Sequence, residues 1–250
     1  DAIWQLSGSA PAAFDAPFSR GVVSPELSES FAVSSSWVWG PSVDAGLPPD
    51  GEKILLRREF MPSKPVRFAG IITAADNAFV LYLNKEEVFS GSGWANLRGG
   101  SIASRLSDDV NEILIVAENR GSKPNAAGVF CAVYLEYADG TVEIIVTDES
   151  WQASERVPEE SLPEKWKLDE LNWHGARVLH DTDWKKKTDA NTGTVLAKAF
   201  VESDRMLRSS LLKADSLMRS LGRPNRDQIV TSRPNELTAL EAVDLSTSAI

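Results

Sequence analysis

A series of short apolar runs, separated by turn residues, fills the sequence up to about residue 184 and constrains its fold more than any other feature. The runs are rich in β-branched and aromatic residues, which favour strands. They are Lys53–Phe60, Val66–Thr73, Ala78–Leu83, Asn111–Glu118, Gly128–Tyr137 and Thr141–Thr147. Asp139-Gly140 joins the last two and is a strong hairpin signal. No amphipathic helical pattern separates the runs, so the sequence predicts a mainly β fold, an antiparallel sandwich.

The period changes to that of a helix near Val195. Apolar residues then recur at spacings of four and three, which place them on one helix face: Leu207, Leu211, Ala214, Met218 and Leu221. Gly222 and Pro224 end this pattern, and a shorter helix is expected from about Pro234. We therefore predict a β-sandwich over residues 1–190 and a short C-terminal helical segment over 191–250. Through Leu207, Leu211 and Met218 the segment is expected to pack on the sandwich, on other domains or on other subunits.

Between Asp148 and Lys187 the strand periodicity fades and tryptophans stand among charged residues. This pattern predicts a strap that lies over the sandwich and is held wherever an indole enters a pocket. The tryptophans concerned are Trp151, Trp166, Trp173 and Trp184, and Trp4, Trp37 and Trp39 are expected to act alike from the N-terminal side.

Charge and composition exclude several classes of protein. The net charge of −10 argues against a nucleic-acid partner, which needs a basic face. The charge is uneven, because residues 195–234 carry +4 and the rest carries −14. No apolar run approaches the roughly 20 residues of a membrane-spanning helix. Cys131 is the single cysteine, so an internal disulfide and a thiolate metal cluster are excluded, and its apolar run predicts a buried, inert thiol.

No catalytic constellation is recognisable. His174 and His180 are not at a metal-ligand spacing, and no Gly-x-Ser-x-Gly motif accompanies them. Carboxylates are plentiful, but none forms a recognisable acid–base pair. We predict no catalytic residue in this chain.

Two groups of residues are candidate binding sites. Trp94, Asn96 and Arg98 lie in a glycine-flanked loop, where an indole can stack on a sugar ring while an amide and a guanidinium bind its hydroxyls. The alternative is that Trp94 closes one end of the sandwich. Asp76 and Asn77 lie between two strong strands and can offer oxygens to Ca²⁺ or to sugar hydroxyls, or simply form a turn. The sequence identifies no complete metal site.

A first resemblance covers the β-type part of the chain. It rests on Trp37-Val-Trp39, Leu56-Arg-Arg-Glu-Phe60, Ala74-Ala-Asp-Asn77, Val80-Leu-Tyr-Leu-Asn84, Trp94, the run from Asn111 to Asn119, Asn125-Ala-Ala-Gly128 and Thr147-Asp-Glu-Ser-Trp151. These stretches resemble the galactose-binding-like jelly-roll domains found beside bacterial α-L-rhamnosidases and in other secreted polysaccharide-processing proteins. The resemblance implies a jelly-roll sandwich and a glycan or polysaccharide as partner. Lys85 departs from that family, which usually has glycine there.

A second resemblance covers the helical part. Asp204-Arg-Met-Leu-Arg208, Ala214–Arg219, Leu221–Arg226 and Thr231–Thr238 look like the end of a planctomycete-type family of unknown function that accompanies c-type cytochrome domains. This implies the C-terminal part of a larger exported protein, periplasmic or extracellular. Haem attachment needs Cys-x-x-Cys-His, which this sequence lacks, so no haem is expected here and no covalently bound cofactor.

Three functions follow as hypotheses. The first is a non-catalytic carbohydrate-binding module of a larger exported protein, with calcium as a possible cofactor. The second is a structural module that docks other domains or subunits of a cytochrome-associated protein. The third is a glycoside hydrolase or its accessory region, for which no catalytic constellation is visible.

Overall fold

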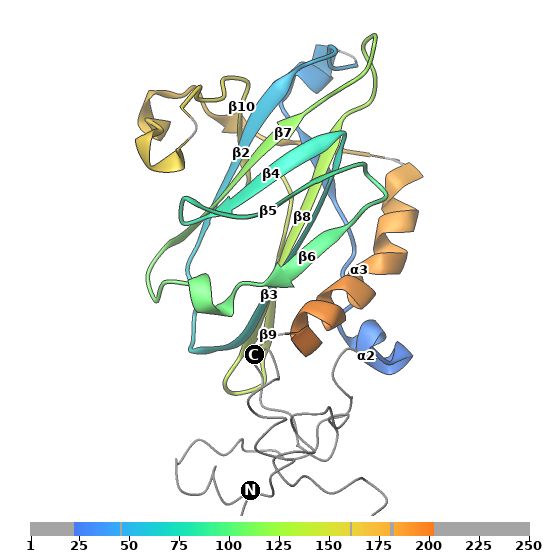
Figure 1. The fold of residues 1–250 in the computed structure, drawn as a ribbon, viewed down its shortest axis with the longest axis vertical. Coiled ribbons are helices and arrows are strands. Elements are labelled where there is room, and N and C mark those ends of the chain that lie inside the picture. Colours follow the sequence, from blue (N-terminus) through green and yellow to red (C-terminus); the bar gives the residue numbers. More distant parts are fainter. Residues whose placement is uncertain (1–22, 46, 161, 181–182, 203–250) are drawn as a thin grey trace, which may run out of the picture. The chain divides into compact units, whose positions relative to one another are not determined.

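The predicted runs form the central strands of two antiparallel sheets (Figure 1). The computed structural model describes residues 23–45, 47–160, 162–180 and 183–202. Four strands have the predicted bounds: β2 Lys53–Phe60, β4 Ala78–Leu83, β7 Asn111–Glu118 and β8 Gly128–Tyr137. Two differ slightly, with β3 running on to Asp76 and β9 spanning Val142–Val146. The mainly β prediction is therefore confirmed.

Sheet A has the order β12-β1-β8-β3-β6, and sheet B has the order β11-β10-β2-β7-β4-β5. The short strands that complete them are β1 Trp37–Trp39, β5 Glu86–Ser92, β6 Arg98–Ser101, β10 Gln152–Ser154, β11 His174–Gly175 and β12 Arg177–Leu179. In the central orders β1-β8-β3-β6 and β2-β7-β4-β5, successive strands alternate between the sheets except at the β4–β5 hairpin, as in a jelly roll. β9 lies beside β8 on the same edge as β1, further along that strand.

The core lies between the two sheets and is built by alternation along each strand. In β2, Ile54 and Leu56 enter the core, while Leu55 between them faces outward. Cys131 is buried in this core, where burial raises the pKa of its thiol to about 12. It therefore has the environment of an inert thiol, as predicted.

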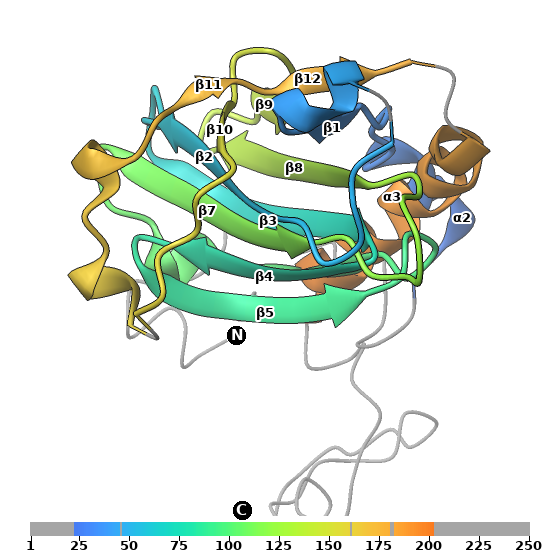
Figure 2. The same cartoon turned by 90° about the horizontal axis from the view of Figure 1, so that it is seen from above.

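The predicted strap covers the outer face of sheet B. Trp166 and Leu168 bury Leu55 and Leu114, which a bare sheet would expose. The indoles of Trp166 and Trp173 donate to the carbonyls of Glu160 and Leu168 at 2.7 and 2.9 Å. Figure 2 shows the strap continuing from β11 at the edge of sheet B to β12 at the edge of sheet A.

Three of the tryptophans predicted to hold the strap have other roles. Trp37 and Trp39 are fully buried within β1 itself, so they do not pin a strap from outside. Trp184 lies in a helix, not in the strap, and its ring packs against Trp37 with centroids 4.9 Å apart. Trp4 lies outside the described residues.

Helix α3 (Asp183–Glu202) covers the outer face of sheet A, and α2 (Pro25–Ser30) packs against α3. Phe31, just after α2, and Phe200 of α3 meet Phe68 of β3 with ring centroids 5.8 and 5.0 Å away. The two helices approach closely at Gly193, where an added Cβ would lie 1.9 Å from the Ser28 carbonyl oxygen.

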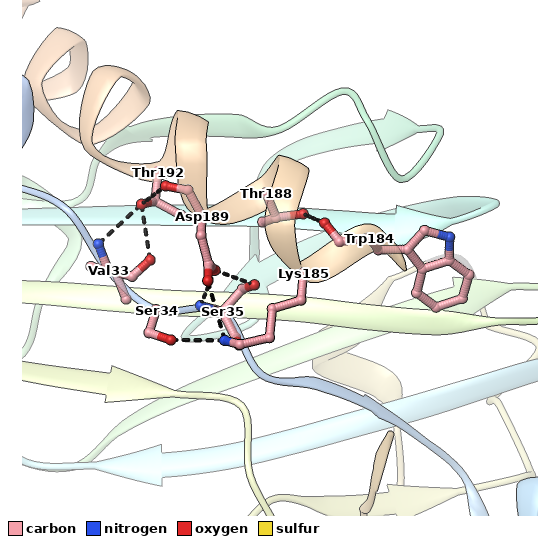
Figure 3. A network of polar contacts seen from close by, with 8 residues as sticks. All are labelled: Val33, Ser34, Ser35, Trp184, Lys185, Thr188, Asp189 and Thr192. Carbon is pink, nitrogen blue, oxygen red and sulfur yellow. Dashed lines mark hydrogen bonds and ion pairs between the residues drawn. The ribbon is translucent and has the colours of Figure 1, made fainter. Parts of the chain in front are cut away.

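Polar contacts fix α3 to the extended segment before β1 (Figure 3). The Thr192 hydroxyl donates to the Val33 carbonyl at 2.9 Å and accepts from its N–H at 3.0 Å. The Asp189 carboxylate accepts from the backbone and the hydroxyl of Ser35 at 2.6 and 2.5 Å, and Lys185 donates to the Ser34 hydroxyl at 2.8 Å. These bonds satisfy backbone groups of an extended segment that no strand among the described residues pairs with at this point.

The helical part differs from the prediction in its start. α3 begins at Asp183, before the predicted change near Val195. The apolar pattern did not reveal this start, because the first turns carry polar residues that contact the Val33–Ser35 segment. The division at 190 and 191 falls inside α3 and stays a prediction. The predicted stripe with Leu207, Leu211 and Met218, and the second resemblance with it, lie outside the described residues.

Candidate functional site

The predicted site residues meet at one end of the sandwich. Asp76 ends β3 and Asn77 precedes β4, while Trp94 and Asn96 lie in the loop between β5 and β6. The N–H of Gly93 in that loop donates to the Asn77 carbonyl at 2.6 Å, so the structure brings the two predicted groups together. Arg98, the first residue of β6, follows directly.

Asn77 connects the segments at this end of the fold through hydrogen bonds. Its N–H donates to the Glu118 carbonyl at 3.1 Å, and its side-chain oxygen accepts from the N–H of Arg120 at 2.5 Å. Its amide nitrogen donates to the Asp76 carboxylate at 2.9 Å. Both ends of the amide are thus used inside the protein, which matches the turn alternative for this residue.

Asp76 is half-buried, and burial raises the pKa of its carboxyl. Within the described ranges no three His, Cys, Asp or Glu side chains are grouped as metal ligands would be. Calcium binding at Asp76 stays a prediction, for which the one available carboxylate is a weak donor set.

Trp94 is half-buried and contacts α3. The Lys187 ammonium lies 5.0 Å from the centroid of its ring, a cation–π distance. One face of the indole is therefore engaged by the helix, and Trp94 ties the β5–β6 loop to α3. A sugar would have to approach the other face or the ring edge.

A cleft of about 1000 Å³ adjoins this loop and extends from sheet B to α3. Asn96 and Arg98 line it, whereas Trp94, Asp76 and Asn77 are not among its lining residues. Its other polar residues are Lys53, Ser90, Ser92, Glu118, Arg120 and Asn191, and its apolar residues include Ala78, Val80, Leu97, Val116 and Val195. The cleft therefore combines an apolar floor with hydrogen-bonding groups around it.

The charges of the cleft are unequally engaged. Arg120 binds Glu118 at 2.7 Å, and the Lys53 ammonium lies 4.0 Å from the same carboxylate. The hydrogen bond from Arg120 lowers the pKa of Glu118, which is thus held as an anion. Arg98 is exposed, and its guanidinium forms no hydrogen bond or ion pair with any described residue.

A second hollow of about 440 Å³ continues the cleft across sheet B, since both are lined by Lys53, Val80 and Val116. It reaches Tyr82 and Trp166, whose rings pack edge to face with centroids 5.4 Å apart. The strap thus forms the far end of one groove that begins at the β5–β6 loop.

The two histidines lie apart in the topology. His174 belongs to β11 of sheet B, where its ring is 3.0 Å from the Asn172 amide. His180 follows β12 of sheet A and lines a separate hollow of about 580 Å³ beside Trp184. No described hydrogen bond links either ring to a carboxylate, as a catalytic triad would require.

Sequence reasoning missed Lys53, Glu118, Arg120 and Asn191 as residues of the cleft. A partial signal was present, because Lys53 and Glu118 are charges at the ends of two predicted strands that pair directly in register. Asn191 carried no such signal, since it reaches the cleft only through the packing of α3.

Known structures resemble parts of this chain. An α-L-rhamnosidase of Streptomyces avermitilis, complexed with L-rhamnose, matches 64% of this chain at 20% identity with a TM-score of 0.51. A lectin of Pleurotus ostreatus matches 61% at 28% identity with a TM-score of 0.49, and a rhamnosidase of Bacillus sp. GL1 matches 62% at 21% identity with a TM-score of 0.48. The chain spans 16%, 44% and 19% of those proteins, respectively.

The likeness to the Streptomyces protein concerns the fold and supports the jelly-roll resemblance. No family model matches the sequence, and no curated protein does. The resemblance to the cytochrome-associated family receives no support from these comparisons.

Proposed function

We propose that this chain is a non-catalytic carbohydrate-binding module whose site is the cleft beside the β5–β6 loop. The observation that carries the proposal is the composition of that cleft, in which Asn96, Arg98 and Asn191 surround an apolar floor of Val80 and Val116. A sugar ring offers an apolar face bordered by hydroxyls, so it needs this combination of surfaces.

The shape of the groove favours a chain of sugars. The first cleft alone, about 1000 Å³, is at the upper end of ordinary ligand pockets. The second hollow extends it along sheet B as far as Trp166. An oligosaccharide fills such a groove, whereas a single ring would leave most of it to water.

The charges of the cleft disfavour hydrolysis. Glycoside hydrolysis generally uses two carboxyl groups, one of them protonated near neutral pH. Glu118 is the carboxylate among the described residues lining the first cleft, and Arg120 and Lys53 stabilise its ionised form. An acid with a lowered pKa cannot protonate a leaving group efficiently.

The module is proposed to belong to a larger exported protein of polysaccharide processing, periplasmic or extracellular. The resemblance to jelly-roll domains beside rhamnosidases supports this setting. No helix of the described residues is long and apolar enough to cross a membrane.

A glycan array probed with the intact chain tests the proposal, with calcium and again with a chelator. Asn191→Ala should weaken retention on any glycan bound, because it removes a cleft amide from an exposed helix position. Asn172→Ala removes an amide outside the cleft and should leave retention unchanged. Equal retention by both variants would contradict the site. A loss of binding with chelator would indicate a calcium-dependent site, with Asp76 as its candidate ligand.

An assembly role is the second candidate, and β9 favours it. Val142 and Ile144 are 47% and 42% exposed, and β9 pairs with β8 alone among the described strands. A short apolar edge of this kind is a surface for association with another domain or subunit. Light scattering on the intact chain and on Ile144→Lys tests this role, which predicts an oligomer that the variant dissociates.

A further inference from the structure

We infer that the cleft selects an acidic glycan, one that carries a carboxylate or sulfate, and that Arg98 binds this anionic group. The inference rests on the proposed function and names the class of glycan for the same site. Three observations support it: the local charge, the availability of one guanidinium, and the way the backbone holds that side chain.

The cleft is positive on an acidic protein. Its described lining contains Lys53, Arg98 and Arg120 against Glu118 alone, whereas the whole chain has a net charge of −10. Lys187 adds a further cation beside the same loop, over the Trp94 ring. A local field of opposite sign to that of the whole protein attracts an anionic ligand to this place specifically.

The cations of the cleft differ in availability. Arg120 and Lys53 share the Glu118 carboxylate, at 2.7 and 4.0 Å, so they mainly neutralise it. Arg98 has no partner among the described residues, and its guanidinium is exposed. A guanidinium can bind a carboxylate or a sulfate through two parallel hydrogen bonds, which a lysine ammonium cannot do.

Arg98 lies on β6, and its side chain extends over Gly91 of β5. Arg98 pairs with Thr73 in the register of β6 and β3. A Cβ added at Gly91 would lie 3.1 Å from the Arg98 Cγ, so the aliphatic stem of Arg98 lies directly over this glycine. Gly91 thus leaves the space that the stem occupies, and the guanidinium is presented from a strand position within the cleft lining.

Other charges place the anionic group at the Arg98 end. Glu159 and Glu160 line the far hollow, so a second anion there would be repelled. Asp76 lies at the same end as Arg98 but is not among the residues that line the cleft. The groove is therefore polarised, with its positive end at the β5–β6 loop.

Binding of the intact chain to polygalacturonate, compared with fully methyl-esterified polygalacturonate, tests the inference. The ester has the same backbone without the charge. We expect binding to the acid to be at least about tenfold tighter at low salt, since only the acid can form a charge-assisted pair of hydrogen bonds with Arg98. Dextran sulfate against dextran is the second arm, and it distinguishes a sulfate site from a carboxylate site.

Arg98→Gln should lower the affinity for the charged polymer about tenfold or more, and Arg98→Lys should recover part of it. Arg67→Gln is the control for overall charge, because it removes an exposed guanidinium at the far end of β3, where Arg67 is paired with Glu136 at 3.2 Å. Equal losses in Arg98→Gln and Arg67→Gln would reveal unspecific attraction and overturn the inference.

The remaining outcomes separate this inference from the proposed function. Equal affinity for acid and ester, or array hits that are all neutral glycans and depend on Asn191, would refute the acidic class and leave the carbohydrate-binding module intact. Absence of binding to every glycan and polymer would refute both. Thermal unfolding of each variant confirms that the folded protein was measured.

Discussion

Two residues in the turn between β4 and β5 adopt a backbone conformation that most side chains avoid. Asn84 and Lys85 have φ of +52° and +69°, as in a two-residue hairpin turn with both central residues left-handed. Asparagine tolerates this conformation, but for lysine it costs about 1–2 kcal/mol. The galactose-binding-like family usually has glycine at the position of Lys85. The turn is therefore formed here with a lysine in a strained backbone conformation.

Lys85→Gly should stabilise the protein. Removing the Cβ relieves the strain, while the greater freedom of glycine in the unfolded chain returns about 0.5–1 kcal/mol. We expect a net gain of roughly 0.5–1 kcal/mol in the free energy of unfolding, measured by urea denaturation. Lys85→Ala is the control: it removes the ammonium but keeps the Cβ, so a similar gain there would contradict the backbone explanation.

Asp76→Asn should change how stability depends on pH. Burial raises the pKa of Asp76 in the folded protein above its unfolded value. Above both values the folded state holds an ionised carboxylate that burial disfavours, and below both the group is neutral in each state, so the cost is present at high pH and disappears as the pH falls. The amide oxygen of Asp76→Asn can still accept from Asn77, as the carboxylate does.

Thermal unfolding of Asp76→Asn at several pH values measures this effect. Its midpoint should exceed that of the unchanged protein at pH 7, and the two should converge below about pH 4, where aspartates are protonated. Asp108→Asn, at an exposed position, should show no such difference. A gain for Asp76→Asn that persists in acid would refute desolvation as its cause.

At the scale of elements, the strands that could be predicted are those with a regular apolar pattern, either alternating or continuous. β2, β4, β7 and β8 have apolar side chains at every second position or throughout, and the sequence alone gave their bounds. β5 (EEVFSGS) and β6 (RGGS) have no such pattern, because they lie at sheet edges. Their pairing follows from the topology, which a local pattern does not contain.

Helix α3 escaped prediction over its first half for a related reason. There the Asp189 carboxylate accepts from Ser35 and the Thr192 hydroxyl donates to the Val33 carbonyl, while Trp184 packs against Trp37. These contacts form no regular apolar stripe that would mark the buried face. Gly193 lowers helix propensity by about 1 kcal/mol relative to alanine, and its reason, the close approach of Ser28, is tertiary.

Thr192→Val tests the role of this polar anchor. Valine has nearly the same shape but leaves the Val33 N–H and carbonyl without their partner in a buried place. Each buried unsatisfied group costs about 1–3 kcal/mol, so we expect a loss of about 2–4 kcal/mol in urea denaturation. Thr194→Val, on the exposed side of the same helix, should change stability by less than about 0.5 kcal/mol. Equal effects would mean that α3 is held by its apolar contacts alone.

At the scale of the whole molecule, the site was predictable only in part. Trp94, Asn96, Arg98, Asp76 and Asn77 do converge at one end of the sandwich, as loops and turns between predicted strands can. The cleft itself is assembled from four strands of sheet B, from Arg98 at the start of β6 in sheet A, from the loops after β5 and β7 and from α3, which are distant in sequence. Its lining therefore depends on the register of sheet B and on the docking of α3, and neither is a property of any single segment.

The end of the folded unit gives the last prediction. Contacts within the chain group Val23–Ser203 into one compact unit, and Leu196, Ala197, Ala199, Phe200 and Val201 are buried in it. A chain of residues 23–203 should therefore unfold cooperatively at the temperature of the full chain. A chain of residues 23–190 loses these side chains and uncovers Phe31, just after α2, and Phe68 of β3.

Each large apolar side chain removed from a buried site costs about 1.5–3 kcal/mol, so the shorter chain should lose several kcal/mol and melt at least about 10 °C lower. Calorimetry on both chains, with a hydrophobic dye to detect the uncovered face, measures the difference. The predicted boundary between residues 190 and 191 left open whether the helical segment packs on the sandwich, on other domains or on other subunits. Equal melting temperatures would establish that boundary and reduce α3 to an appendage, whereas the packing of Phe200 between Phe31 and Phe68 favours a sandwich that is incomplete without its helix.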